Sequence, residues 1–144
     1  KKKIINQVDL IEKFYKKKFN KKPNIAINGL NPHCESNYKY SEEKRIIAPA
    51  IKYLSKNRYK IKGPFAADTV FTKENLKSFD VIIGMYHDQV LTPVKTLFGF
   101  DAINITLGLP FIRISPDHGP NITMLGKNLS NPQSLIKALK FLDK

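Results

Sequence analysis

Short runs of branched apolar residues alternate with amphipathic segments along this chain, and that alternation limits the folds open to it more than any other feature. Four short runs have the composition of strands: 25–30 (IAINGL), 59–63 (YKIKG), 80–85 (DVIIGM) and 101–108 (DAINITLG). Three longer segments have helical character, 8–19, 41–55 and 130–142, and the segment 87–100 is expected to form a loop and a short helix. Strands that alternate with helices predict an α/β fold. We therefore expect a three-layer open sheet with helices on both faces.

The length of the chain predicts one domain. At 144 residues it is long enough to bury a core and too short for two domains of ordinary size. We take residues 1–144 as that domain, with 1–24 as a leading helix and connector. The chain begins KKKIINQ without an initiator methionine, which fits a piece of a longer polypeptide and fits processing equally well.

The helix expected at 41–55 has a clear start signal. The hydroxyl of Ser41 suits an N-cap, and Glu42 and Glu43 follow it in the first turn, where the helix dipole favours negative charge. Pro49 lies inside the segment and predicts either a kink or a later start.

The formal charge of +13 raises the question of nucleic-acid binding. The excess is almost all lysine, since the only arginines are Arg45, Arg58 and Arg113. Asparagine and isoleucine are abundant as well, which is the pattern that an AT-biased genome imposes on solvated positions. Base recognition needs arginine or stacking aromatic residues on one patch, and the sequence contains no such patch or known binding motif. We expect no specific nucleic-acid partner.

Membrane insertion and disulfide bonding are not expected either. No apolar run approaches the roughly 20 residues that span a bilayer. Cys34 is the single cysteine, so an internal disulfide is excluded. These features predict a soluble cytoplasmic protein in a reducing compartment.

Unusual polar residues follow three of the predicted strands, at 31–33 (NPH), 86–88 (YHD) and 107–113 (LGLPFIR). In open parallel sheets, ligands bind in the crevice outside the carboxyl ends of the strands. His33 and His87 are candidate ligands for a divalent metal. Asp68 and Asp88 are candidate ligands or partners of the histidines. Taken singly, each histidine is more often a surface or core residue, and each aspartate suits a turn or helix cap equally well.

Lys95, Asn104 and Arg113 recur at intervals of nine residues. Together they suit a cradle for a phosphate or a carboxylate group. Asn104 interrupts an apolar run, so we expect its amide to be buried and hydrogen-bonded. The Pro-Asp-His-Gly sequence at 116–119 places His118 in a turn, which turn chemistry alone explains.

Four stretches in register resemble the carboxyl-terminal half of the 4-hydroxythreonine-4-phosphate dehydrogenase family: NGLNPH (28–33), GPFAADTVF (63–71), GMYHDQVLTPVK (84–95) and NITLGLPFIRISPDHG (104–119). The resemblance extends over residues 25–140. It implies a fold related to isocitrate and isopropylmalate dehydrogenases. It also implies an NAD-dependent, metal-assisted oxidation of 4-phosphooxy-L-threonine, with decarboxylation to 3-amino-2-oxopropyl phosphate, in pyridoxal 5'-phosphate biosynthesis.

The resemblance assigns roles to individual residues. The implied ligands of a divalent cation, whether zinc, magnesium, manganese or cobalt, are His33 and His87. The implied substrate contacts are Lys95, Asn104 and Arg113. The implied catalytic residues are Lys95, Asp88 and Asp68, and the implied NAD contacts are Asp117, His118 and Gly119.

A full member of this family is much longer, and the resemblance implies further site residues from its amino-terminal half and active sites shared within a homodimer. We therefore expect a partial site in this chain, with little turnover by the chain alone. Two alternatives stay open. One is a non-catalytic remnant kept for dimerisation, and the other is a related dehydrogenase that acts on another phosphorylated hydroxy acid.

Overall fold

The structure is a computed structural model of the chain, and it describes residues 1–34, 38–120 and 122–143. The chain forms two compact units, which we call unit 1 (Lys1–Leu91) and unit 2 (Thr92–Lys144). Residues 35–37, shortly after His33, lie outside the described residues. That both units belong to a single domain stays a prediction.

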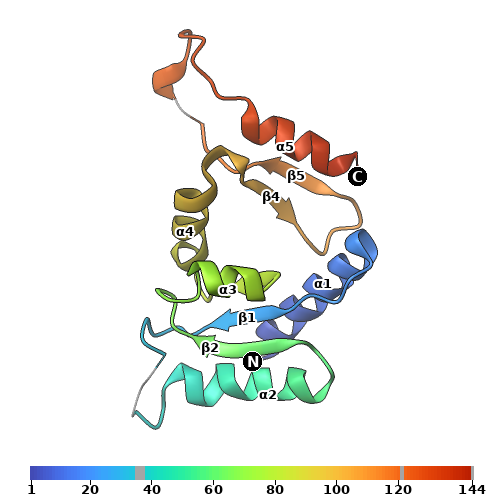
Figure 1. Cartoon of the computed structure of the whole chain (residues 1–144), viewed down its shortest axis with the longest axis vertical. Helices are drawn as coiled ribbons and strands as arrows, with labels where there is room; N and C mark the ends of the chain where they lie inside the picture. The colour runs from blue at the N-terminus through green and yellow to red at the C-terminus, as the bar shows by residue number, and fades with distance from the viewer. Residues whose placement is uncertain (35–37, 121, 144) are drawn as a thin grey trace. The chain divides into compact units, whose positions relative to one another are not determined.

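Unit 1 is built on a three-stranded parallel sheet. Its strands β1 (Ile25–Asn28), β2 (Ile61–Phe65) and β3 (Val81–Ile83) have the order β2-β1-β3. β1 is central, because Ile25 pairs with a residue of β2 and with a residue of β3. Figure 1 shows β1 and β2 side by side. The predicted α/β class, with a parallel sheet, is confirmed.

β1 supplies the centre of the core. All four of its residues are buried, as expected for a strand with a neighbour on each side in a parallel sheet. Side chains alternate along a strand, so Ile25 and Ile27 share one face. On that face they meet apolar side chains from two helices and from β2. The resulting core cluster consists of Val8, Ile25, Ile27, Ile47, Ile51, Leu54 and Ile61.

The first helix of this face is α1 (Lys2–Phe19). It begins earlier than the predicted start at residue 8, because Ile4 and Ile5 also pack against the core cluster. It ends at Asn20, whose φ of 48° is the left-handed conformation typical of a helix C-cap. No helix in the described ranges is long and apolar enough to cross a membrane.

The second helix of this face has an irregular start. A π-helix, η1 (Glu43–Ile47), leads into α2 (Ala48–Lys56). Pro49 lies in the first turn of α2, where its missing N–H does no harm. The helical segment as a whole begins at Glu42, so the start predicted at Ser41 is confirmed and the later start offered for Pro49 is not. The Ser41 hydroxyl accepts a hydrogen bond from the backbone N–H of Lys44 at 3.3 Å, as predicted for a capping residue.

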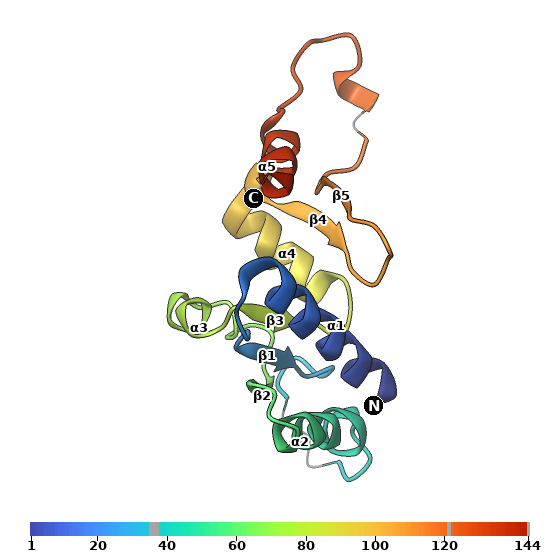
Figure 2. The ribbon, with the colours of Figure 1, turned by 90° about the vertical axis from the view of Figure 1, so that its right-hand side faces the viewer.

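The third helix of unit 1, α3 (Lys73–Ser78), lies on the opposite side of the sheet from α1 (Figure 2). The strand order explains this position. The chain moves from β1 to β2 in one direction and from β2 to β3 in the other, so two right-handed crossovers place their helices on opposite faces. Unit 1 therefore has the three layers that the sequence predicted.

Two of the predicted strands differ in detail from the structure. β3 lies within the strand predicted at 80–85, but it is an edge strand of this sheet and its residues are only half-buried. The strand predicted at 59–63 begins and ends two residues later, so Gly63 and Pro64 both lie in β2. Gly63 has a φ of 137°, and a Cβ there would lie 2.4 Å from the carbonyl oxygen of Ile27. The close approach of β2 to β1 therefore requires glycine at this position.

Unit 2 is built on a hairpin. β4 (Ile103–Thr106) pairs antiparallel with β5 (Arg113–Pro116), and α5 (Gln133–Leu142) packs against both. The strand expected at 101–108 is present, but its expected place in the parallel sheet was wrong. β5 falls in a segment that glycine and prolines mark as loop. The remaining elements of this region are α4 (Asp88–Phe98), η2 (Gly99–Asp101) and η3 (Ile122–Met124).

α5 packs through its small residues. Ser134 and Ala138 are buried, whereas the apolar side chains of Leu135 and Leu139 remain about half exposed. The carboxylate of Asp101 accepts a hydrogen bond from the side-chain amide of Gln133 at 3.0 Å and pairs with Lys137 at 3.3 Å. These partners lower the pKa of Asp101 and fasten η2 to α5.

A buried carboxylate fixes the loop that follows β1. Glu43 is 4% exposed, and its Oε1 accepts hydrogen bonds from the backbone N–H groups of Leu30 at 2.9 Å and Asn31 at 2.7 Å. Burial acts to raise the pKa of this carboxyl group. The hydrogen bonds donated by the backbone and by Ser41 together outweigh burial, so the pKa of Glu43 is lowered. The ionised carboxylate is therefore the form that holds the loop.

Leu54→Ala is expected to lower the free energy of unfolding by about 2–5 kcal/mol, because it removes a fully buried side chain from the core cluster. Tyr53→Ala is the matched control. This neighbour on α2 is 48% exposed, so we expect a loss below about 1 kcal/mol. Urea unfolding followed by circular dichroism measures both. Equal losses in the two variants would contradict the described core.

Glu43→Gln is expected to lower the free energy of unfolding at neutral pH by about 1–3 kcal/mol, because a neutral amide replaces a charged acceptor. The pKa of Glu43 is lower in the folded than in the unfolded chain. Its contribution is therefore complete above the unfolded value of 4.5 and is lost as pH falls through the folded value.

Urea midpoints of the parent and of Glu43→Gln should thus differ at neutral pH and converge in acid. Glu42→Gln, at the exposed neighbouring position, should follow the parent throughout. A difference between parent and Glu43→Gln that stays constant with pH would show that the carboxylate does not hold the loop.

Candidate functional site

Polar side chains gather at the carboxyl edge of the parallel sheet. Asp68 lies in the turn after β2, His33 in the loop after β1, and His87 and Asp88 directly after β3. Because the strands are parallel neighbours, these segments leave the same edge. The order β2-β1-β3 also puts the switch point between β1 and β3, where open α/β sheets bind ligands. The structure therefore brings the four predicted residues of unit 1 to one edge.

Gln89 ties the two histidine loops together. It is 5% exposed, its side-chain nitrogen donates to the carbonyl oxygen of Gly29 at 2.7 Å, and its side-chain oxygen accepts from the N–H of Met85 at 2.8 Å. Gly29 follows β1, and Met85 follows β3. One buried side chain thus links the backbone before His33 to the backbone before His87.

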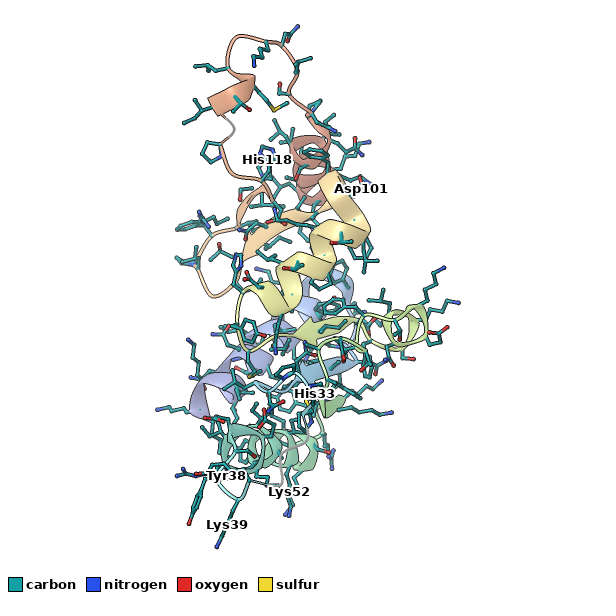
Figure 3. All side chains as sticks on the ribbon, turned by 90° about the vertical axis from the view of Figure 1, so that its left-hand side faces the viewer. His33, Tyr38, Lys39, Lys52, Asp101 and His118 are labelled. Carbon is teal, nitrogen blue, oxygen red and sulfur yellow. The ribbon has the colours of Figure 1, made fainter. Side chains whose placement is uncertain are left out.

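His87 is oriented by its neighbour. The Nδ1 atom of His87 lies 2.7 Å from Oδ1 of Asp88. A carboxylate on one ring nitrogen fixes the ring and leaves the other nitrogen, Nε2, for a metal. Both side chains are largely exposed. His33, labelled in Figure 3, is exposed as well, and its turn is fixed by a hydrogen bond from its backbone N–H to the side chain of Asn31 at 2.9 Å.

The described residues do not by themselves form a metal centre. Among them, no three side chains of histidine, cysteine, aspartate or glutamate lie close enough together to hold an ion. His33 and His87 have suitable donor atoms, but a zinc site takes three or four protein ligands. A metal on these two histidines would need further ligands from outside the described residues.

Two residues near His33, Cys34 and Asn28, lie in unusual environments. Burial raises the pKa of the Cys34 thiol, and the negative charges of Glu43 and Asp68 raise it further. Asp68 therefore lies within electrostatic reach of the loop that carries His33. Beneath it, the side chain of Asn28 is fully buried at the end of β1, and neither its nitrogen nor its oxygen has a hydrogen-bond partner in the described part of the chain. A buried unpaired amide is unusual in a folded protein.

In unit 2, the polar residues lie on one face of the hairpin. Asn104 pairs with Ser115, and Thr106 pairs with Arg113. Opposite residues of an antiparallel pair share a face, as do residues two apart along a strand, so all four side chains point the same way. The guanidinium of Arg113 donates to the Thr106 hydroxyl at 2.7 Å. The expectation that Asn104 is buried was wrong: its strand is covered on the other face only, and its amide is exposed.

Lys95, the remaining residue of the cradle predicted with Asn104 and Arg113, contacts the turn after β5. The ammonium group of Lys95, on α4, donates to the backbone carbonyl of Asp117 at 2.5 Å and lies 3.6 Å from its carboxylate. His118, labelled in Figure 3, is exposed next to it. A Cβ added to Gly119 would meet nothing within 4 Å, so this glycine borders open space.

Several residues that hold these segments in place escaped the sequence analysis. Glu43 was noted only as a charge in a helix start, and Ser134 was not singled out within the helix predicted at 130–142. Gln89 had no signal apart from its place beside His87 and Asp88. A polar residue in an otherwise apolar helical face, as at Ser134 and Gln89, is the one clue the sequence offered.

Comparisons with known proteins agree on one family. The family profile described as "Pyridoxal phosphate biosynthetic protein PdxA" matches residues 1–142. A 4-hydroxythreonine-4-phosphate dehydrogenase from Sulfurihydrogenibium sp. (strain YO3AOP1) is 49% identical over 142 residues, or 97% of this chain and 44% of the relative. One from Bradyrhizobium diazoefficiens is 45% identical over 139 residues, or 95% of this chain and 40% of the relative.

Solved structures similar to this chain carry the same enzyme name. A putative 4-hydroxythreonine-4-phosphate dehydrogenase from Salmonella typhimurium superposes with a TM-score of 0.75 at 37% identity, over 92% of this chain and 41% of that chain. The enzyme of the same name from Klebsiella pneumoniae superposes with a TM-score of 0.78 at 33% identity, over 96% and 42%. The chain thus spans well under half the length of the relatives it matches. Since the family profile covers nearly the whole chain, the chain belongs to the pyridoxal phosphate biosynthetic protein PdxA family.

Proposed function

We propose that this chain is the carboxyl-terminal part of a 4-hydroxythreonine-4-phosphate dehydrogenase and that it contributes some of the active-site residues. The observation that carries the proposal is the match of residues 1–142 to the PdxA family, with relatives of that name 45–49% identical over 139–142 residues. The reaction is the NAD-dependent oxidation of 4-phosphooxy-L-threonine, also called 4-hydroxythreonine 4-phosphate, with decarboxylation. Because the chain spans only 40–44% of those relatives, turnover requires the remaining portion of the enzyme.

Unit 2 supplies the substrate contacts in this proposal. Lys95, Asn104 and Arg113 bind the phosphorylated hydroxy acid. The guanidinium of Arg113 is already oriented by its hydrogen bond to Thr106, and it presents two parallel N–H groups to a phosphate or carboxylate. Asn104 offers an amide on the same face of the hairpin. An exposed polar face with one arginine and one amide suits an anionic group such as a phosphate or a carboxylate.

Unit 1 supplies the polar groups of the sheet edge. Asp88 and Asp68 are proposed catalytic residues of unit 1, and Lys95 is the proposed catalytic residue of unit 2. Asp88 also orients the ring of His87. A divalent cation held in part by His33 and His87 would polarise the substrate oxygen when bound. The choice among zinc, magnesium, manganese and cobalt depends on ligands beyond these two histidines.

The turn at Asp117, His118 and Gly119 is proposed as the NAD contact, and its open space at Gly119 supports this. NAD accepts the hydride when bound, while the protein supplies alignment and charge. We further propose a homodimer with shared active sites in the cytoplasm.

Arg113→Lys tests the substrate assignment. The change keeps the charge but removes the paired N–H groups, so KM for the phosphorylated substrate should rise by about tenfold or more. The assay uses a chimera in which the uncovered part of the Sulfurihydrogenibium relative precedes this chain, and it follows NADH formation. Arg58→Lys, an exposed arginine of unit 1, should leave KM unchanged. Equal KM values in all three proteins would contradict the assignment.

Zinc binding by the chain as it stands tests the histidines. With two suitable ligands and no group of three among the described residues, we expect weak binding that is lost in the His33→Ala, His87→Ala double variant. His118→Ala is the matched control and should bind like the parent. Isothermal titration calorimetry measures all three. Tight binding that persists in the double variant would place the metal elsewhere.

A further inference from the structure

The position of Lys95 depends on one residue, Asp117. The Lys95 ammonium contacts both the carbonyl oxygen of Asp117, at 2.5 Å, and its carboxylate, at 3.6 Å. The lysine side chain is 48% exposed, whereas that of Asp117 is only 13% exposed. The flexible, solvated partner is therefore held by the more buried one.

Asp117 is in turn held by a buried hydroxyl. The backbone N–H of Asp117 donates to Oγ of Ser134 at 3.1 Å, and Ser134 donates its own proton to the carbonyl oxygen of Ala102 at 2.5 Å. Ser134 is 1% exposed, so water cannot replace either bond. The hydroxyl of Ser134 therefore acts as an acceptor in one hydrogen bond and as the donor in the other.

These bonds join the segments that carry the proposed substrate contacts. Ala102 immediately precedes β4, which carries Asn104, and Asp117 immediately follows β5, which begins with Arg113. Ser134 lies in the first turn of α5. One hydroxyl therefore connects both strands of the hairpin to α5 and, through Asp117, to Lys95.

We propose that Ser134 and Asp117 are positioning residues that hold the Lys95 ammonium in place for an anionic substrate. The identity of the ligand in this inference rests on the proposed function. The hydrogen bonds that join Ser134, Asp117 and Lys95 are independent of it. A free lysine side chain samples many rotamers, and ordering it on binding weakens affinity. Lys95 is already ordered by the turn. An ammonium group has three N–H donors, so it still has one for a phosphate.

The first test measures Lys95 without any ligand. In the 15N-labelled chain, the ammonium signal of a lysine with fixed acceptors exchanges slowly with water and becomes visible at low temperature. We expect this signal for Lys95 in the parent and its loss in Ser134→Ala. Ser134→Thr keeps the hydroxyl and should keep the signal, and Ser130→Ala, at an exposed serine, should keep it too. Asp117→Asn should also keep it, because the closer acceptor is the retained backbone carbonyl.

The second test measures binding of 4-hydroxythreonine 4-phosphate to the same proteins by calorimetry. Ser134→Ala should weaken binding by about tenfold when Lys95 is present and should have no further effect in a Lys95→Ala background. That dependence on Lys95 separates positioning from a general loss of structure.

The two tests separate the inference from the proposed function. A Lys95 signal that survives unchanged in a folded Ser134→Ala variant overturns the inference. So does a Ser134→Ala defect of equal size with and without Lys95. If Ser134→Ala does not fold, loss of the signal in Ser134→Thr would overturn it as well. If the signals behave as expected and no variant changes ligand affinity, the proposed substrate contact fails while the positioning of Lys95 stands.

Discussion

The burial of β1 between two parallel neighbours is the constraint on which unit 1 depends. Its four residues have no exposed face, so the strand is stable only while β2 and β3 satisfy its backbone and the helices cover its side chains. That arrangement fixes where β1 and β3 end. The loops that carry His33 and His87 follow those ends, so the candidate ligand-binding edge follows directly from the packing of one four-residue strand.

A few buried polar groups then set the geometry that apolar packing leaves open. Glu43 holds the backbone after β1, Gln89 joins it to the backbone after β3, and Ser134 joins the strands of the hairpin to α5. Each makes at least two hydrogen bonds away from water, where such bonds are directional and costly to leave unmade. Nonspecific packing would tolerate small shifts of these loops, whereas paired hydrogen bonds do not. The proposed metal ligands His33 and His87 and the proposed substrate contacts Lys95, Asn104 and Arg113 remain exposed and available to ligands.

The sequence predicted the features that depend on neighbouring residues. It did not predict the features that depend on contacts between residues far apart in the chain. The strand predicted at 25–30 and the capping hydroxyl of Ser41 are both found in the structure, because each signal acts within a few residues. β5 was missed, since Gly108, Pro110 and Pro116 make the segment resemble a loop and only pairing with β4 makes it a strand. Asn104 was misplaced for the same reason, because burial of a strand depends on the layer that covers it. Gln89 reaches Gly29, sixty residues away in the chain, and no periodicity encodes that contact.

The central claim is that the polar face of the hairpin in unit 2 binds the phosphorylated end of the substrate. A map of backbone chemical shifts, recorded while the 15N-labelled chain is titrated with 4-hydroxythreonine 4-phosphate, tests this most directly. We expect the largest changes at Asn104, Thr106 and Arg113. Changes confined to the lysine-rich helix α1, with none on the hairpin, would show that the ligand only follows the net positive charge and would contradict the account.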